Sequence, residues 1–313
     1  MRAIAQTLAL LCGLLLVCAP PFAQADHRRP ECDNSGRMSI SFVEIDSYDF
    51  LTRAPLKVKG KLTLPGDWYR GRCGSHRHKV PAVVILHGSA GIDFRGNFYA
   101  EALNRAGIAT LEIDMWEARD VASGADRPPL PLYTYPDAFA SLAFLADYPG
   151  IDAQRIGVLG FSWGAVMAMA SATQGVVAQF GVGQLQFKAH VAHYPICYAY
   201  NNPNIRNSDF GASAGNPLTG APILIEVGSL DDYDKGAGPC LALRAGLTEE
   251  ERALVRVNVY DGAYHAWDRL LVPTTEQDPF ANLGQGGTVR LVPDVEDAYL
   301  SRERVVKFFR RNL

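Results

Sequence analysis

The stretch Ile156-Gly157-Val158-Leu159-Gly160-Phe161-Ser162-Trp163-Gly164 decides the fold of this chain. It begins as an apolar strand and ends in the pattern G-x-S-x-G, and a run of small residues typical of a closely packed helix follows at 165–172. A serine on a sharp turn between a strand and a helix is presented as a nucleophile, and the two glycines let both backbones approach each other. The sequence therefore predicts that Ser162 is an enzymatic nucleophile.

A serine hydroxyl needs a neighbouring base that accepts its proton. On a turn of this kind the nucleophile is followed along the chain first by the acid and then by the histidine. His265 is the only histidine after His193, and it lies in a turn-rich stretch directly after the apolar run 254–260. We expect His265 to be the general base.

The acid is expected after an earlier strand, which the apolar run 221–227 predicts. Three carboxylates follow that run: Asp231, Asp232 and Asp234. Asp231 comes first, at the end of a G-x-x-D pattern, and is the preferred candidate for the group that orients the imidazole and stabilises its charged form. Asp232 and Asp234 are the alternatives, and the two carboxylates without this role are expected to be solvated or to cap backbone groups.

The oxyanion of an acyl-transfer intermediate needs two donors held in place. The backbone N–H of Trp163, next to the nucleophile, is one expected donor. The second is expected in the loop after an earlier strand, where His87-Gly88-Ser89-Ala90-Gly91 follows the apolar run 81–86. We expect the N–H of Ser89 to be that donor and His87 to brace the loop.

The rest of the pattern predicts an α/β fold with a mainly parallel central sheet. Residues 37–64 alternate between polar and apolar, as half-exposed antiparallel strands do. Later apolar runs are continuous, as in strands buried on both faces. Such strands are expected at 81–86, 108–113, 155–161, 189–194, 221–227 and 254–260. The alternation of strands with long crossovers places helices on both faces of the sheet.

Helix limits are predicted from end signals. One helix is expected at 97–106, with Gly107 at its C-terminal cap. A second is expected to begin at Thr134, with its hydroxyl as the cap, and to run to about residue 147. Further helices are expected at 163–173 and 295–313.

The first 25 residues have the pattern of a secretory signal peptide. Arg2 provides a positive start, residues 8–17 are apolar, and Ala23-Gln24-Ala25 fits a cleavage site. The apolar run is too short to span a bilayer. We expect an exported protein, periplasmic or secreted, with one domain at 26–313 and no membrane span in the mature chain. The net charge of −3 and the lack of a basic stripe argue against a nucleic-acid partner.

Four cysteines follow the expected signal peptide: Cys32, Cys73, Cys197 and Cys240. An even number in an oxidising compartment suggests two disulfides, for which three pairings exist. Buried free thiols are the alternative. There is no C-x-x-C pair, and the histidines of His76-Arg77-His78 have no further ligand nearby, so no metal site is expected.

Several aromatic residues could line a substrate pocket or could belong to an ordinary core. His190 and His193 are expected to pack at a strand end, with His193 bordering the site. The pocket candidates are Trp116, Tyr133, Tyr135, Tyr198 and Trp267.

These features resemble the dienelactone hydrolase family of the α/β-hydrolases over roughly residues 55–313. The resemblance is carried by residues 160–164, by Asp231 in G-x-x-D, by Tyr264-His265-Ala266-Trp267 and by residues 84–91. It implies an α/β-hydrolase fold, a nucleophile–Asp–His triad and no metal or organic cofactor. Exported relatives often carry cysteines at the places of Cys197 and Cys240, so the resemblance also implies a Cys197–Cys240 pair, which leaves Cys32 to pair with Cys73.

Two departures bear on the substrate. The namesake enzymes carry a cysteine nucleophile where this chain has Ser162, and they act in pathways that are usually cytoplasmic, whereas this chain begins with an export pattern. Both differences favour hydrolysis of a small-molecule carboxylic ester through an acyl-enzyme over the namesake lactone reaction. Amide, peptide or lactone hydrolysis by the same triad, and a non-catalytic binding protein, are the alternatives.

Overall fold

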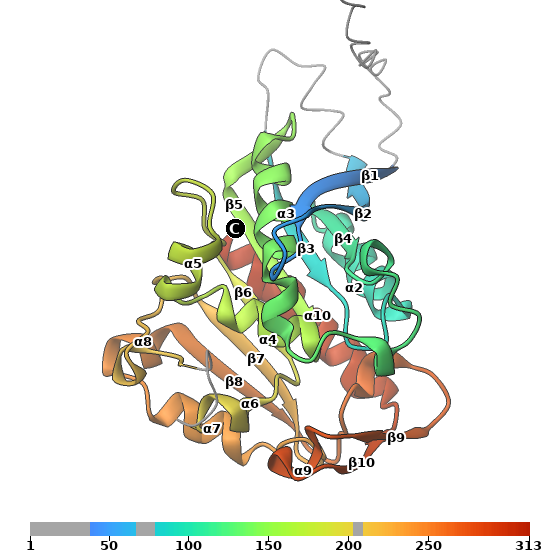
Figure 1. The fold of residues 1–313 in the computed structure, drawn as a ribbon, viewed down its shortest axis with the longest axis vertical. Helices are drawn as coiled ribbons and strands as arrows, with labels where there is room; N and C mark the ends of the chain where they lie inside the picture. Colours follow the sequence, from blue (N-terminus) through green and yellow to red (C-terminus); the bar gives the residue numbers. More distant parts are fainter. Residues whose placement is uncertain (1–37, 67–78, 203–208) are drawn as a thin grey trace, which may run out of the picture. The chain divides into compact units, whose positions relative to one another are not determined.

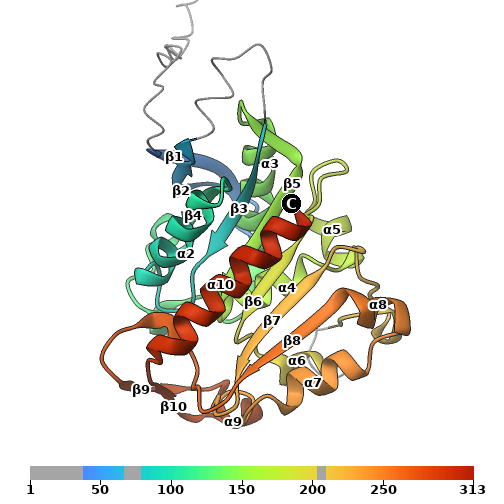
Figure 2. The ribbon, with the colours of Figure 1, turned by 180° about the vertical axis from the view of Figure 1, so that it is seen from behind.

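Strands and helices alternate along the chain, and their arrangement is seen in a computed structural model (Figures 1 and 2). It describes residues 38–66, 79–202 and 209–313. The expected signal peptide, the Cys32–Cys73 pair and the His76 and His78 side chains lie outside these ranges. The strands of the main sheet are β1 (Ser39–Tyr48), β2 (Pro55–Leu64), β3 (Val80–Leu86), β4 (Ala109–Asp114), β5 (Ile151–Phe161), β6 (His190–His193), β7 (Ile223–Gly228) and β8 (Val255–Tyr260).

Within the described ranges these strands form an eight-stranded sheet in the order β1-β2-β4-β3-β5-β6-β7-β8. β1 pairs with β2, and β2 with β4, in antiparallel fashion. The remaining neighbours, from β4 and β3 to β7 and β8, are parallel. The structure confirms a mainly parallel sheet with antiparallel N-terminal strands. Because parallel strands end at the same edge, the loops after β3, β5, β7 and β8 meet there.

The helices cover both faces of the sheet, as expected. On one face lie α2 and α10 (Figure 2), and on the other lie α3 and α4 (Figure 1). The alternation of β3 shows why both faces are covered: Val83 and Ile85 pack with one apolar cluster, and Val84 and Leu86 pack with the other. The α-helices are α2 (Phe94–Arg105), α3 (Tyr135–Asp147), α4 (Trp163–Ala170), α5 (Gln174–Phe180), α6 (Cys197–Tyr200), α7 (Gly238–Ala245), α8 (Glu249–Leu254), α9 (Ala281–Gly284) and α10 (Val295–Asn312).

A second, two-stranded ribbon was not predicted from the sequence. It consists of β9 (Thr274–Asp278) and β10 (Gly287–Leu291), which pair in antiparallel fashion. The turn between them is tied to the loop after β7, since the N–H of Asn282 donates to the carbonyl of Asp232 and the N–H of Leu283 donates to that of Tyr233. We call β9, its turn and β10 the hairpin.

Two predicted helix starts are corrected by the structure. α2 begins at Phe94, earlier than expected, because the side chain of Asp93 accepts from the N–H of Arg95 and caps the helix. Thr134 precedes α3, but its hydroxyl does not cap that helix. It donates to the carbonyl of Pro131 and accepts from the indole N–H of Trp163. In the described part of the chain, no helix is both long and apolar enough to cross a membrane.

Candidate active site

The turn that carries Ser162 is as tight as the sequence predicts. β5 ends at Phe161 and α4 begins at Trp163, so Ser162 alone makes the turn, with φ 49° and ψ −106°. Such a backbone is strained for a residue with a side chain. A Cβ on Gly160 would lie 1.9 Å from the carbonyl oxygen of Gly164, and one on Gly164 would lie 2.3 Å from that of Leu86. Only glycine fits at these two positions.

Ser162, His265 and Asp231 come together at the carboxyl edge of the sheet. The Oγ of Ser162 lies 3.0 Å from Nε2 of His265, and Nδ1 of His265 lies 2.8 Å from Oδ2 of Asp231. All three side chains are buried. A carboxylate at Nδ1 favours the tautomer protonated there, which leaves Nε2 free to accept the proton of the Ser162 hydroxyl.

The three neighbouring carboxylates have different partners. Asp231 contacts His265, and its other oxygen accepts from the N–H of Tyr233. Asp232 pairs with Arg290 of the hairpin, Nη2 to Oδ1 at 2.7 Å. Asp234 accepts from the N–H groups of Cys197 and Tyr198, where α6 begins. Of the three, only Asp231 is placed to orient the imidazole.

The loop expected to hold the oxyanion donors lies against the same serine. Ser89 and Ser162 line the same hollow, and Trp163, as the first residue of α4, has an N–H with no acceptor inside its helix. His87 braces the loop, as expected. Its Nδ1 lies 2.7 Å from the carbonyl of Gly88, and its Nε2 accepts from the N–H of Met115 at 3.0 Å.

His87 is neutral over most of the pH range. Burial lowers the pKa of its imidazole to about 4. A neutral ring with Nδ1–H toward Gly88 and a bare Nε2 toward Met115 satisfies both contacts at once, whereas a protonated ring would set a donor against the Met115 N–H. The loop that carries Ser89 is therefore fixed by an uncharged side chain.

Two tyrosine rings enclose the imidazole of His265. The centroids of Tyr194 and Tyr233 lie 4.7 Å and 4.4 Å from it. The hydroxyl of Tyr194 accepts from Nη1 of Arg95 and donates to Oδ1 of Asp268, at 2.8 Å and 2.6 Å. Burial would raise the pKa of the Asp268 carboxyl, but its contacts with His193 first, and then with Arg95 and Tyr194, hold it below its ordinary value. A buried chain of hydrogen bonds from Arg95 through the Tyr194 hydroxyl to Asp268 thus fixes the wall behind the imidazole.

Two hollows meet at Ser162. The first, which we call the apolar cavity, has a volume of about 100 Å³. The second, the polar hollow, measures about 20 Å³ and is lined by His265 together with Arg95, Arg269 and Glu276. Ser89, Ser162 and Tyr233 line both. The remaining residues of the apolar cavity are Arg127, Leu130, Pro131, Trp163, Val166, Ile196, Tyr198, Ala199, Asp278 and Phe280.

Of the aromatic residues predicted for the pocket, only Tyr198 lines the apolar cavity. Trp116 is buried behind it, and its indole N–H donates to the carbonyl of Ser89 at 2.9 Å, so it braces the loop instead. Tyr133 packs against Phe50 outside the cavity, and Tyr135 is buried against α5. Trp267 is fully buried and packs against His193 and Tyr194.

Sequence reasoning missed most of the cavity wall. Tyr233 could have been found, since it lies two positions after Asp231, but Arg127, Asp278 and Phe280 are far from any motif. His190 and His193 are buried packing groups at a strand end, as expected, and the carbonyl of His193 accepts from the N–H of Ser162 at 3.0 Å.

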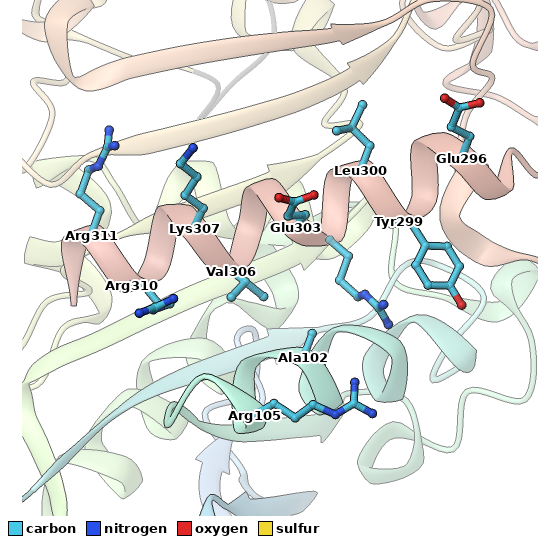
Figure 3. A pocket seen from close by; sticks show the side chains of 11 residues that line it. Ala102, Arg105, Glu296, Tyr299, Leu300, Glu303, Val306, Lys307, Arg310 and Arg311 are labelled. Atoms are coloured by element: carbon cyan, nitrogen blue, oxygen red, sulfur yellow. The ribbon is translucent and has the colours of Figure 1, made fainter.

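A larger hollow, of about 1140 Å³, lies between α2 and α10 (Figure 3). Charged side chains dominate its lining, among them Arg105, Glu303 and Lys307, and none of the predicted site residues reaches it. It contains no serine, cysteine or histidine that could serve as a nucleophile or base. The candidate active site is therefore the smaller pair of hollows at Ser162.

Cys197 and Cys240 form a disulfide, the pairing that the family resemblance implies. It joins α6, which carries Tyr198 of the cavity wall, to α7. Among the described residues, the grouping of candidate metal ligands is Cys197, Asp234 and Cys240. Both sulfurs are used by the disulfide, so this grouping offers only the carboxylate of Asp234.

The fold defines the class: an α/β-hydrolase. A putative dienelactone hydrolase from Klebsiella pneumoniae is 15% identical, with 87% of this chain and 99% of that chain covered and a TM-score of 0.54. Esterase 2 of Thermogutta terrifontis is 14% identical, with 88% and 94% covered and a TM-score of 0.57. Est1E from Butyrivibrio proteoclasticus is 15% identical, with 86% and 98% covered and a TM-score of 0.53.

The family follows from the sequence itself. The profile of the Dienelactone hydrolase family matches residues 71–311, which is more than half of the chain. The chain therefore belongs to the dienelactone hydrolase family, as the motifs around Ser162, Asp231 and His265 predicted. No curated protein sequence matches it at a significant level.

Proposed function

We propose that this chain is a serine hydrolase that cleaves carboxylic esters. The observation that carries the proposal is the continuous contact from Ser162 Oγ to His265 Nε2, at 3.0 Å, and from His265 Nδ1 to Asp231, at 2.8 Å. This is the geometry that a serine needs in order to lose its proton as it attacks a carbonyl. Membership of a hydrolase family supports the same reaction class.

In the proposed mechanism the Oγ of Ser162 attacks the ester carbonyl carbon while Nε2 of His265 takes the hydroxyl proton. The N–H groups of Ser89 and Trp163 donate to the oxyanion that forms. The carbon–oxygen bond to the alcohol breaks, and the alcohol leaves with the proton from His265. Water then attacks the acyl-enzyme with His265 as base, which releases the carboxylic acid and restores Ser162.

We also propose that the enzyme is exported and that residues 26–313 form the mature, single-domain protein. The Cys197–Cys240 disulfide supports this proposal, because disulfides persist in oxidising compartments and are rare in the cytosol.

The test is replacement of the nucleophile. Ser162→Ala should reduce turnover of p-nitrophenyl acetate by at least about a thousandfold, because the hydroxyl that forms the acyl-enzyme is gone. A fluorophosphonate probe should label the wild type at Ser162 and leave the variant unlabelled. Ser213→Ala, at an exposed serine, is the matched control and should behave as the wild type. Full activity or full labelling of folded Ser162→Ala protein would refute the proposal.

A further inference from the structure

The two hollows at Ser162 differ in chemistry and in their relation to His265. The apolar cavity is walled largely by Leu130, Pro131, Val166, Ile196 and Phe280, whereas the polar hollow is walled by charged side chains and by His265 itself. His265 does not line the apolar cavity. An ester bound at Ser162 has two halves, and only the larger of the two hollows has room for one of them.

The position of His265 indicates on which side of Ser162 the alcohol and the acyl group of the ester lie. The base that accepts the Ser162 proton must later give it to the leaving alcohol oxygen, so that oxygen has to lie beside Nε2 of His265. The alcohol oxygen therefore lies at the polar hollow, whose volume of about 20 Å³ holds that oxygen and not the rest of the alcohol. The acyl half, which stays bonded to Ser162 Oγ, is left with the apolar cavity. Ser89 and Trp163, the expected oxyanion donors, both line that cavity, so the acyl carbonyl would stand beside it.

The size of the apolar cavity limits the acyl chain. Its volume of about 100 Å³ is smaller than the engineered cavity of about 150 Å³ that holds one benzene molecule. A chain of a few carbons fits, but a medium-length chain or an aromatic acyl group does not. The wall is also stiff on two sides, because Trp163 is hydrogen-bonded to Thr134 and Tyr198 lies on a helix fixed by the Cys197–Cys240 disulfide.

The charge of the apolar cavity limits the acyl group further. Among the described residues, Arg127 is its only cationic lining side chain, and Nη2 of Arg127 lies 2.7 Å from Oδ2 of Asp278. The hydroxyl of Tyr233 donates to the same oxygen at 3.0 Å. Both Arg127 and Asp278 are largely buried. The positive charge is therefore already neutralised, and a carboxylate on the acyl chain would meet no free counterion in an apolar wall.

We propose that the apolar cavity is the acyl subsite and that it selects esters of short, uncharged acyl groups. This inference rests on the proposed function, since it assumes that Ser162 forms an acyl-enzyme. Two side chains set the selection: Phe280 closes the cavity against longer chains, and Asp278 suppresses the attraction of Arg127 for anionic ones.

The first experiment measures chain length. The full chain hydrolyses p-nitrophenyl acetate, butyrate, hexanoate and octanoate, and kcat/KM should fall at least about tenfold from butyrate to octanoate, since surplus methylenes have no space. Phe280→Ala should reduce that fall, and Leu130→Ala, a smaller change at the half-exposed rim, should reduce it less. Leu241→Ala, an exposed leucine on α7, is the control and should keep the wild-type profile. A wild type that prefers octanoate would overturn the inference.

The second experiment measures charge. The monosuccinate ester of p-nitrophenol should be cleaved at least about tenfold less efficiently than the butyrate by the wild type. Asp278→Asn, which frees the charge of Arg127, should raise the succinate-to-butyrate ratio about tenfold, whereas Asp261→Asn, an exposed change of equal charge, should not. An unchanged ratio in folded Asp278→Asn protein would overturn the role of Asp278. Fluorophosphonate labelling of Ser162 distinguishes failure of the acyl subsite from failure of the proposed function. Labelled protein without these preferences refutes the subsite alone, and unlabelled protein refutes the proposed function.

Discussion

Asp232 forms its ion pair with Arg290 of β10, at 2.7 Å, and turns away from the imidazole that its chain neighbour Asp231 contacts. Arg290 also donates its backbone N–H to Asp232, at 2.9 Å. The loop after β7 thus serves two structures at once: Asp231 holds His265, and Asp232 holds the hairpin that carries Asp278 and Phe280. The three carboxylates, of which the sequence favoured Asp231 with Asp232 and Asp234 as alternatives, have separate partners in the fold.

A matched pair of variants tests this division. Asp231→Asn should lower kcat for p-nitrophenyl acetate by up to about 10⁴-fold, because the amide cannot hold the reactive tautomer of His265 or stabilise its charge. Asp232→Asn removes the same charge one position along and should keep kcat within about tenfold, since the Arg290 pair is half-exposed and contributes little. If Asp232→Asn had the larger effect on kcat, the acid would be misassigned.

The sheet and the meeting of Ser162, His265 and Asp231 could be predicted because each depends on local pattern. Ser162, Asp231 and His265 each follow a strand that is visible in the sequence, and parallel strands bring their carboxyl ends to one edge. Gly160 and Gly164 predicted the turn because the two backbones must approach closely there. In the structure, a Cβ at either position would clash with a backbone carbonyl. Nothing beyond strand order was needed to bring these side chains together.

The cavity wall could not be predicted, because it depends on contacts between distant segments. Arg127 and Asp278 are 151 residues apart, and their pairing depends on a hairpin whose first strand, β9, contains no apolar residue. Trp267 shows a second reason. Ala266, between it and His265, has φ 55° and ψ 40°, a left-handed conformation that turns the chain, so Trp267 enters the core while His265 faces Ser162. Trp267 lies only two positions after His265 in the sequence, but this did not indicate that its side chain points into the core.

Thr134 joins the cavity wall to the start of α4. Its hydroxyl donates to the carbonyl of Pro131 at 2.9 Å in a partly buried contact, and it accepts from the indole N–H of Trp163 at 2.9 Å in a buried one. Thr134→Val keeps the shape but leaves both partners unpaired, so the free energy of unfolding should fall by about 1–3 kcal/mol for the buried indole N–H and by less for the partly buried carbonyl. Thr134→Ser keeps the hydroxyl and should recover most of the loss. Urea unfolding measures both, and a valine variant as stable as the wild type would contradict this role.

The Cys197–Cys240 disulfide closes a loop with a sequence separation of 43. Removing it should lower the free energy of unfolding by up to about 4 kcal/mol, by releasing the unfolded chain from that constraint. The double substitution C197S/C240S should also raise KM for short esters, because α6 carries Tyr198 of the apolar cavity. Dithiothreitol should destabilise the wild type more than the double variant, in which only the expected Cys32–Cys73 pair is left to reduce. A wild type with the same urea midpoint before and after complete reduction would rule out this contribution.

Two sets of buried groups contribute to stability in opposite directions between about pH 4 and pH 7. Burial lowers the pKa values of His87 and His190 to about 4, from an ordinary 6.5. In that window the unfolded state holds their protons and the folded state does not, so the free energy of unfolding falls as the pH falls. Asp234 acts in the opposite direction. Burial, and then the charge of Asp231, raise its pKa to about 7 from 3.8, so the folded state binds the extra proton.

Asp234→Asn removes the group that offsets the two histidines. The loss of stability on acidification from pH 7 to pH 4.5 should become steeper than in the wild type, by about 1.4 kcal/mol per pH unit for the one proton removed. Asp232→Asn is the control: its Arg290 pair lowers the pKa of that carboxyl despite partial burial, so it titrates below the window and its curve should run parallel to the wild type. Urea unfolding at half-unit steps of pH gives the slopes. A constant difference between Asp234→Asn and the wild type across the window would mean that Asp234 takes up no proton there, and that its carboxylate is fully stabilised by the N–H groups of Cys197 and Tyr198.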